Sequence, residues 1–384
     1  MNITKNWKII SNLEVNYKIV FSENIFEKDN LEILKYGNSG SNIKRLLIID
    51  KNVSDLYLKQ IAKYFDSNNV ITKFLIVDGG EEEKNLDNLF KILETIEQFG
   101  ISRKNEPVIG IGGGVILDLV GFACSIYRRG IPYIRVPTTL LGIVDVSVAA
   151  KTGINYLSRR NRLGSYFPPL SNILDTSFLK SLEEIELISG LGEILKMAVI
   201  KDTALFELIE SHGDRLLQEK FQSDPADQII SKSIEGMKTS LENNLWENNL
   251  ERDVDFGHSF SPIIEMRSLS NPKLFLTHGQ AVSLDVLFSS CIAFKRNLLT
   301  SEELDRIFKT AKKLKLPTSH ESFEDKLLLW ESLNDTVKHR NGDQNLPIPN
   351  GIGSCVFLND FDYSEIDGVI ELFKNLGKWK QKQL

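Results

Sequence analysis

The sequence contains few cysteines, and they are not spaced for a structural role. Cys124, Cys291 and Cys355 are the only three in 384 residues, and each lies among apolar neighbours far from the other two. A disulfide framework or a cysteine-bound zinc needs cysteines at short intervals, so neither is expected. The simpler interpretation is three reduced thiols in the core of a cytoplasmic protein.

Long apolar segments and a large excess of either charge are also missing. No run approaches the roughly 20 apolar residues that cross a membrane, and residues 1–18 alternate polar and apolar side chains where a signal peptide would have an apolar centre. The formal net charge of -6 is small for this length, whereas nucleic-acid binding needs a clustered basic surface. We therefore predict a cytoplasmic protein that binds neither membrane nor nucleic acid. The short basic cluster Arg159, Arg160 and Arg162 fits an anion-binding loop.

The length of the chain indicates two domains, and its pattern changes near residue 175. Before this point, short apolar runs alternate with helical patterns such as residues 86–99. The runs cover residues 45–50, 72–77, 107–112 and 132–137. Such a pattern predicts a parallel sheet with helices on both faces.

After residue 175, helical periodicity dominates until a strand-like run at residues 354–358. The helical patterns cover residues 183–200, 204–217, 229–241, 279–296 and 301–314. We predict an α/β domain over residues 1–175 and a mostly helical domain over residues 176–384.

A glycine-rich turn follows the third apolar run. Gly110-Ile-Gly-Gly-Gly-Val115 lies between a predicted strand and a predicted helix, where glycines let backbone N–H groups approach a pyrophosphate. Val115 occupies the last position of a Gly-x-Gly-x-x-Gly fingerprint, so the standard dinucleotide motif is not satisfied. The turn alone fits nucleotide binding and a plain tight turn equally well. Asp50, at the end of the first run, could accept from ribose hydroxyls or cap a helix.

Eight longer motifs carry a family resemblance. They read GGGVILDLVGFA (112–123), YRRG (127–130), VPTTLL (136–141), VDVSVAAKTGIN (144–155), RNRLG (160–164), GLGEILK (190–196), DFGHSFS (255–261) and THGQAV (277–282). In this order they resemble the dehydroquinate synthase superfamily of sugar phosphate cyclases, over residues 45–360. The resemblance implies an N-terminal NAD-binding domain, a helical metal-binding domain and an active site between them. It also implies a homodimer.

The resemblance places the metal ligands at Glu193, His258 and His278. One carboxylate and two imidazoles form a plausible open catalytic zinc site, and cobalt is a second possible metal. Taken singly, each residue also fits an exposed acid or a hydrogen-bonded histidine. The sequence has only five histidines; His212 and His320 lie in polar surroundings, and we expect them at the surface.

The other site residues are likewise implied by the resemblance. The predicted NAD-binding residues are Asp50, Asn52, Glu81, Lys84, Gly113, Gly114, Val115, Asp118, Thr138, Thr139 and Arg160. The predicted catalytic residues are Lys151, Lys196, Asp145, His258 and Asp255. The predicted substrate-binding residues are Arg129, Asn155, Asn161, Lys338 and His339. Arg129, Lys151 and Lys338 supply the cationic donors that a phosphate needs, although a single such residue is more often a solvated surface charge.

One segment departs from the pattern of dehydroquinate synthases, which reads Arg-x-x-x-Asn-Phe-Gly-His-x-x-x-His. Here Glu251, Asp255 and Pro262 stand in place of the arginine, the asparagine and the second histidine. An aspartate would repel the carboxylate of the dehydroquinate synthase substrate, whereas it accepts well from hydroxyls. Arg252 could still bind a carboxylate, so this segment favours a polyol substrate without excluding the other.

Further residues resemble the branch of 2-epi-5-epi-valiolone synthases, which cyclise sedoheptulose 7-phosphate. They are Asp255, His339, the segment Lys151–Asn155 and Phe167-Pro-Pro169. The alternatives are 2-epi-valiolone synthases, desmethyl-4-deoxygadusol synthases and 3-dehydroquinate synthases. In such a reaction NAD takes a hydride, phosphate leaves by β-elimination, the hydride returns, and the opened ring closes by an aldol step. Two other classes are an alcohol or glycerol dehydrogenase, which would accumulate NADH, and an inactive protein-binding homologue, which would have lost ligands.

Overall fold

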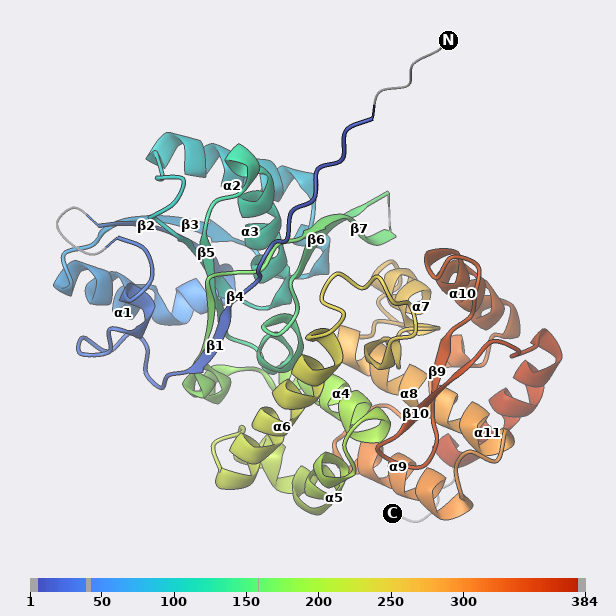
Figure 1. Ribbon diagram of the computed structural model, residues 1–384. Coiled ribbons are helices and arrows are strands. Elements are labelled where there is room, and N and C mark those ends of the chain that lie inside the picture. Colours follow the sequence, from blue (N-terminus) through green and yellow to red (C-terminus); the bar gives the residue numbers. More distant parts are fainter. Residues whose placement is uncertain (1–5, 39–42, 158, 379–384) are drawn as a thin grey trace, which may run out of the picture.

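The N-terminal part of the chain is built on a six-stranded parallel sheet. The computed structural model describes residues 6–38, 43–157 and 159–378 (Figure 1). The sheet has the order β1-β8-β5-β4-β2-β3. Its strands are β1 (Lys18–Phe21), β2 (Lys44–Asp50), β3 (Ile71–Val77), β4 (Val108–Gly112), β5 (Tyr133–Pro137) and β8 (Ser171–Leu174). Since β3 and β4 pair with opposite sides of β2, the strand order reverses there, and ligands bind at the carboxyl ends of strands beside such a reversal.

Helices cover both faces of this sheet, as predicted. The helix α1 (Lys51–Ser67) packs on one face, and α2 (Leu86–Phe99) and α3 (Gly114–Ile126) pack on the other. Side chains alternate along a strand, so Leu47 and Ile49 of β2 join the core around α1, while Leu46 and Ile48 join the core around α2 and α3. The four predicted apolar runs match β2, β3, β4 and β5 to within one residue, and α2 has the predicted bounds.

A two-stranded hairpin lies outside the main sheet and was not predicted. It consists of β6 (Lys151–Tyr156) and β7 (Arg159–Tyr166), which pair antiparallel. The hairpin packs closely on α3, because a Cβ at Gly121 would lie 2.4 Å from the Thr152 side chain. Its sequence shows no alternation of apolar and polar residues, which is the pattern that identifies a strand.

The rest of the chain is mostly helical, as predicted. Its helices are α4 (Glu184–Ile200), α5 (Thr203–Gln218), α6 (Asp224–Leu241), α7 (Ser261–Leu269), α8 (His278–Lys295), α9 (Ser301–Lys313), α10 (Lys326–His339) and α11 (Ile366–Lys378). They share one apolar core and are joined by an antiparallel pair, β9 (Leu346–Pro349) and β10 (Cys355–Leu358). In the described ranges, no helix is long and apolar enough to span a bilayer. The division of the chain at residues 175 and 176 stays a prediction.

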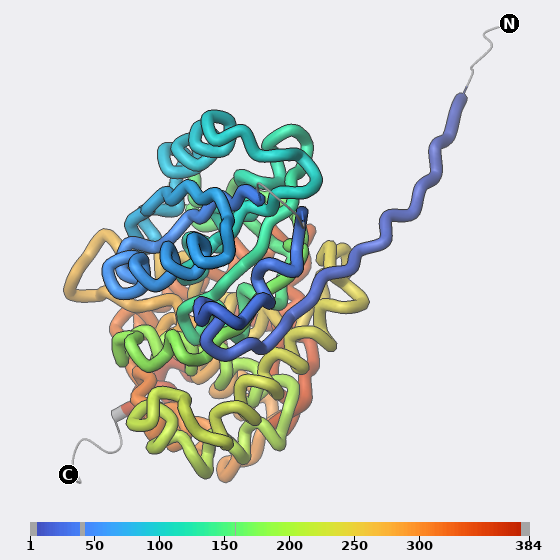
Figure 2. The backbone as a smooth tube through the Cα atoms, turned by 90° about the vertical axis from the view of Figure 1, so that its left-hand side faces the viewer, coloured from blue at the N-terminus to red at the C-terminus, as the bar shows by residue number. Residues whose placement is uncertain are grey.

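The segment before β1 lies apart from this body. Residues 6–17 belong to no helix or strand and run outward as an extended arm (Figure 2). The root of the arm is held, because the hydroxyl of Tyr17 donates to the carbonyl oxygen of Val148.

Two glycines let α4 and α8 touch backbone to backbone. A Cβ at Gly192 would lie 2.1 Å from the carbonyl oxygen of Gly279, and a Cβ at Gly279 would lie 1.7 Å from that of Ser189. The N–H of Gly279 also donates to Ser189 Oγ at 3.1 Å. Gly192 precedes Glu193 and Gly279 follows His278, so this contact brings the two predicted metal ligands together.

We expect Gly192→Ala to lower the free energy of unfolding by about 1–3 kcal/mol, because the added methyl group overpacks the contact between α4 and α8. Urea denaturation measures this change. The matched control is Gly236→Ala in α6, where a Cβ would meet the flexible side chains of Met197 at 3.2 Å and Lys201 at 3.9 Å. Equal unfolding midpoints for Gly192→Ala and the wild type would contradict the close helix contact.

Candidate active site

A cavity of about 1900 Å³ lies between the parallel sheet and the helical part of the chain. Residues at the carboxyl ends of β2, β4 and β5 line one side, the hairpin β6–β7 lines another, and α7, α8 and α10 contribute to the third. Four predicted site residues do not line it: Arg129, Asn155, Glu193 and Lys338. All the other predicted NAD-binding, catalytic and substrate-binding residues do.

The four exceptions lie in two different positions. Glu193 and Asn155 stand behind the cavity wall: Glu193 is buried beneath the two histidines, and Asn155 donates to Glu81 Oε1 at 2.9 Å. Arg129 and Lys338 are exposed, and neither is among the residues of this chain that line the cavity. Their predicted contact with the substrate phosphate therefore stays a prediction.

On the nucleotide side, Asp50 both caps a helix and faces the cavity. It precedes α1, and its Oδ1 accepts from the N–H of Asn52 at 2.8 Å. Two glycines leave room for it, since a Cβ at Gly79 would lie 2.7 Å from Asp50 Oδ2 and a Cβ at Gly112 would lie 3.0 Å from Asp50 Cβ. Burial raises the pKa of Asp50. Asp50 can therefore both cap α1 and accept from ribose hydroxyls, the two functions considered for it above.

On the same side of the cavity, Lys84 links α3 and β7. It is buried and forms an ion pair with Asp118 of α3 at 2.5 Å. It also donates to Asn161 Oδ1 in β7 at 2.6 Å. Three predicted site residues from distant parts of the sequence thus hold one another in place.

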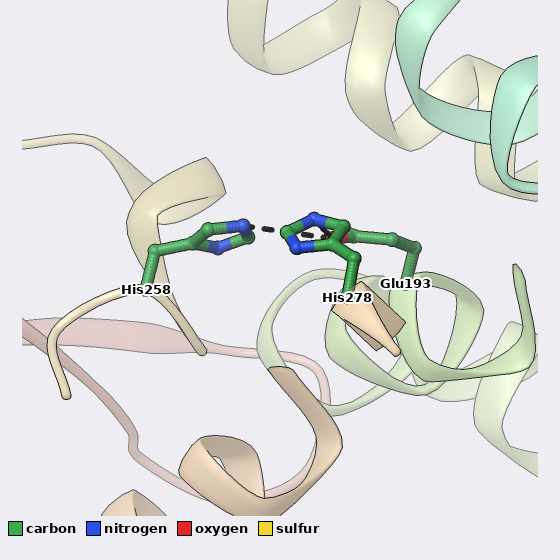
Figure 3. A group of neighbouring side chains, drawn as sticks. All are labelled: Glu193, His258 and His278. Atoms are coloured by element: carbon green, nitrogen blue, oxygen red, sulfur yellow. Dashed lines mark ion pairs between the residues drawn. The ribbon is translucent and has the colours of Figure 1, made fainter. Parts of the chain in front are cut away.

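The three predicted metal ligands converge (Figure 3). The ligand atoms of Glu193, His258 and His278 all lie within 4.8 Å of one another. The Nε2 atoms of His278 and His258 are 3.1 and 3.6 Å from Glu193 Oε1. Neither oxygen of this buried carboxylate has a partner in hydrogen-bonding geometry among the described residues, although Lys196 Nζ is 2.5 Å away. Two imidazoles facing an unsatisfied buried carboxylate fit a zinc-like ion.

The Nδ1 atom of each histidine, on the side of the ring away from Glu193, also has a polar neighbour. Nδ1 of His278 is 3.0 Å from Glu265 Oε2, and Nδ1 of His258 is 3.2 Å from the carbonyl oxygen of Phe256. The acceptor at Nδ1 of His258 favours the tautomer that presents a bare Nε2 to a metal. Nδ1 of His278 lies between Glu265, which accepts, and Nη1 of Arg160 at 2.6 Å, which donates. Burial lowers the pKa of His258 to about 3, so its imidazole is neutral.

Burial and Arg160 lower the pKa of His278, but Glu265 and Glu193 outweigh them and raise it to about 9. A metal bound at this point would therefore displace a proton from His278. Burial raises the pKa of Glu265, but Arg160 and His278 outweigh it, and the result is about 2. Glu265 consequently carries its charge beside the histidine.

Glu265 was not predicted from the sequence, although a signal exists. It lies on the buried stripe of α7 together with Ser261, Ile264 and Ser268. This spacing is that of a core-facing helix surface, and an acid at such a position needs a partner. Recognising that partner required the structure, because Arg160 reaches Glu265 at 2.6 Å from β7 and also contacts Glu81 at 3.2 Å.

Asp145 and Lys196 both line the cavity, and each feels the charge of the metal ligand Glu193. Asp145 lies in the π-helical turn Gly142–Val146. Burial and the charge of Glu193 raise its pKa. Burial lowers the pKa of Lys196, but Glu193 and Asp145 outweigh it and raise the pKa. A carboxyl with a raised pKa beside a protonated ammonium is suited to holding or moving a proton.

Opposite the nucleotide wall, a network of charges surrounds Asp255. Arg252 donates to Asp255 Oδ2 at 2.6 Å and Arg340 donates to the same oxygen at 3.3 Å. Arg252 also pairs with Glu247, which contacts Lys151 at 2.8 Å. Burial raises the pKa of Asp255, but the two arginines outweigh it and lower the pKa, so Asp255 is ionised. Glu247 and Arg340 were not singled out from the sequence, because nothing in their local patterns relates them to Asp255.

His339 lies at the rim of the same cavity. Its Nε2 is 2.9 Å from Arg162 of β7 and 3.7 Å from Asp335 of α10, and Asp335 also pairs with Arg159 at 3.0 Å. Arg159 and Arg162, two members of the basic cluster predicted to bind an anion, thus contact α10 beside the cavity.

Known proteins resemble this chain over most of its length. Residues 74–189 match the family model of the 3-dehydroquinate synthase N-terminal domain, and residues 190–338 match that of the C-terminal domain. A 2-epi-5-epi-valiolone synthase from Streptomyces albus is 41% identical over 381 residues, which cover 97% of this chain and 92% of the relative. A demethyl-4-deoxygadusol synthase from Trichormus variabilis is 34% identical over 94% of this chain and 88% of the relative.

One solved structure is similar to this chain in both sequence and fold. It is ValA, a 2-epi-5-epi-valiolone synthase from Streptomyces hygroscopicus subsp. jinggangensis with NAD+ and Zn2+ bound. Its sequence is 39% identical, the TM-score is 0.91, and the match covers 96% of this chain and 99% of ValA.

We expect Glu265→Gln to weaken zinc binding by roughly ten- to a hundredfold, because the neutral amide holds the Nδ1–H of His278 less strongly. Competition with a chromophoric chelator measures this affinity without any turnover. Glu235→Gln is the matched control, since Glu235 is an exposed acid of α6 that pairs only with Lys238 among the described residues. An unchanged zinc affinity in Glu265→Gln would show that Glu265 does not support the metal site.

Proposed function

The chain belongs to the 3-dehydroquinate synthase family, and from that premise we propose that it is a sugar phosphate cyclase that converts sedoheptulose 7-phosphate into 2-epi-5-epi-valiolone and phosphate. The observation that carries this choice of substrate is the ionised Asp255 between Arg252 and Arg340. Two named 2-epi-5-epi-valiolone synthases are 41% and 39% identical in sequence to this chain, which supports this choice of substrate.

We propose NAD and a zinc ion, with cobalt as an alternative, as the cofactors. The residues at the carboxyl ends of β2, β4 and β5 would hold NAD, and Glu193, His258 and His278 would hold the metal. When bound, NAD takes a hydride from the substrate and returns it, and the metal polarises substrate oxygens. The protein's own residues must then orient the sugar and move its protons.

Lys151 is suited to binding the negatively charged part of the substrate. Its side chain is 53% exposed, and its exposed part faces the cavity. Burial lowers the pKa of Lys151, but Glu247 and Asp255 outweigh it and raise the pKa, so the ammonium stays charged. A protonated amine held by Glu247 donates to phosphate or carbonyl oxygens. We assign proton transfers near the metal to Asp145 and Lys196, and further phosphate contacts to Arg129, Asn161 and Lys338.

The pairing of Arg252 disfavours a carboxylated substrate. Its guanidinium contacts both Asp255 and Glu247, so a substrate carboxylate would have to compete with two protein carboxylates for one cation. In contrast, Oδ1 of Asp255 takes no hydrogen bond within the described ranges, and an ionised oxygen accepts well from hydroxyls. We therefore favour the polyol end of sedoheptulose 7-phosphate over the substrate of dehydroquinate synthases.

We further propose that the protein is a cytoplasmic homodimer. Cys124, Cys291 and Cys355 are free thiols, which is the usual state in a reducing compartment. Sugar phosphates and NAD are the expected small-molecule partners. The products of the remaining alternatives, including 2-epi-valiolone and demethyl-4-deoxygadusol, differ in stereochemistry or substituents and are separated by product analysis.

We expect the zinc-loaded protein with NAD to release phosphate from sedoheptulose 7-phosphate without net formation of NADH. Phosphate release and absorbance at the NADH wavelength are followed together, and the cyclic product is identified by NMR. The carboxylated seven-carbon substrate of dehydroquinate synthases serves as the comparison. Efficient formation of dehydroquinate, or stoichiometric NADH, would refute the proposed reaction.

We expect Asp255→Ala to lower kcat/KM by roughly ten- to a hundredfold or more, because it removes a charge-assisted hydrogen bond and the carboxylate that pairs with the buried Arg340. Steady-state phosphate release measures this loss. Asp253→Asn is the matched control, since Asp253 lies on the same 3-10 turn but pairs with Lys201 at 2.6 Å. Equal losses in the two variants would show that the turn, and not the carboxylate of Asp255, is important.

A further inference from the structure

The N-terminal arm exposes large apolar side chains that a single chain leaves in water. Trp7, Ile9 and Leu13 are 83%, 95% and 82% exposed, and Ile10 is 75% exposed. Contiguous apolar residues exposed to this degree are rare on a monomer and indicate an interaction surface. The arm extends away from the body in both views (Figures 1 and 2).

The sequence of the arm is that of a strand. Apolar side chains occupy alternate positions at Trp7, Ile9, Leu13 and Val15, interrupted only by Ser11 at the centre. Alternation of this kind places these side chains on one face of an extended segment. Residues 6–17 nevertheless form no strand in a single chain. The arm is therefore an extended segment with one mostly apolar face, while Ile10 lies on the opposite face with Lys8, Asn12 and Glu14. Residues 6–17 pair with no strand in the described part of the chain.

We propose that the arms of two copies of this chain pair antiparallel with each other, with Ser11 opposite Ser11. This register places Lys8 opposite Glu14, Trp7 opposite Val15 and Ile9 opposite Leu13. Opposite charges directly across a strand pair stabilise it, and a two-fold axis repeats each contact. The inference deepens the proposed homodimer and rests on it.

The charges of the arm select this register. A shift by one residue would place the apolar face of one arm opposite the polar face of the other. A shift by two residues keeps the faces but sets Lys8 opposite Asn12 or opposite Asn16, and the Lys8–Glu14 pair is lost. Self-complementarity of both charge and apolar face favours a second copy over an unrelated partner. Since a two-stranded ribbon is marginally stable alone, the pairing of the arms depends on the dimer that brings them together.

A cysteine at the proposed axis tests the register. In Ser11→Cys the two new thiols face each other, so mild oxidation of the full-length protein should give a disulfide-linked dimer. Asn12→Cys is the matched control, because its thiol lies on the other face and opposite Ile10 of the second copy. We expect the initial cross-linking rate of Ser11→Cys to exceed that of Asn12→Cys severalfold on non-reducing gels. The wild type should not cross-link, since Cys124 and Cys291 are buried and Cys355 is half-buried.

A charge exchange tests the Lys8–Glu14 pair in the same background. Adding Lys8→Glu to Ser11→Cys places two like charges opposite each other twice in the dimer, and we expect the cross-linking rate to fall severalfold. Adding both Lys8→Glu and Glu14→Lys restores the opposite charges with reversed sign, and the rate should recover.

Light scattering on the uncross-linked protein distinguishes the possible failures. If the wild type is a dimer but Ser11→Cys and Asn12→Cys cross-link at equal rates, the proposed arm pairing is wrong and the proposed homodimer stands. A monomeric wild type would overturn both. A failure of the proposed reaction would appear in phosphate release alone, which none of these measurements uses.

Discussion

The direct backbone contact between α4 and α8 is the constraint on which the metal side of the cavity depends. It exists because Gly192 and Gly279 have no side chains at the point where the helices meet. Any Cβ there would separate the helices and, with them, Glu193 from His278. From α7, Glu265 reaches Nδ1 of His278 at 3.0 Å. The geometry of the three ligands is therefore a property of helix packing as much as of the ligands themselves.

Much of the fold could be predicted from local pattern, because buried parallel strands are continuous apolar runs and α2 carries a clear helical period. The hairpin β6–β7 was missed because its strands mix lysine, glycine and asparagine without alternation. For the site, motif resemblance placed the three ligands, which do converge. It could not reveal Glu247 or Glu265, since Lys151 and Arg160, which pair with them, come from remote segments. It also gave no sign that Arg129 and Lys338 would lie outside the cavity lining of one chain.

The charged residues around the cavity are paired differently at its two ends. Near the metal ligands, carboxylates meet one buried lysine, so proton-holding groups have shifted pKa values. At the opposite end, Arg252 and Arg340 meet Asp255 and Glu247, so these two cations are already engaged. A ligand carrying hydroxyls exchanges water for these groups at little electrostatic cost, whereas an added anion must displace a carboxylate. The same arrangement therefore binds the sugar and sorts it by charge.

The contacts of Arg160 link the hairpin β6–β7 to two other walls of the cavity. From β7 it contacts Glu81 on the nucleotide wall and Glu265 behind His278. A displacement of the hairpin large enough to admit or release a sugar by this route would break both contacts together. The opened protein would then lose the guanidinium that pairs with Glu265 behind His278 while bulk water enters. Opening by this route would therefore be coupled to the loss of charge pairing behind a metal ligand.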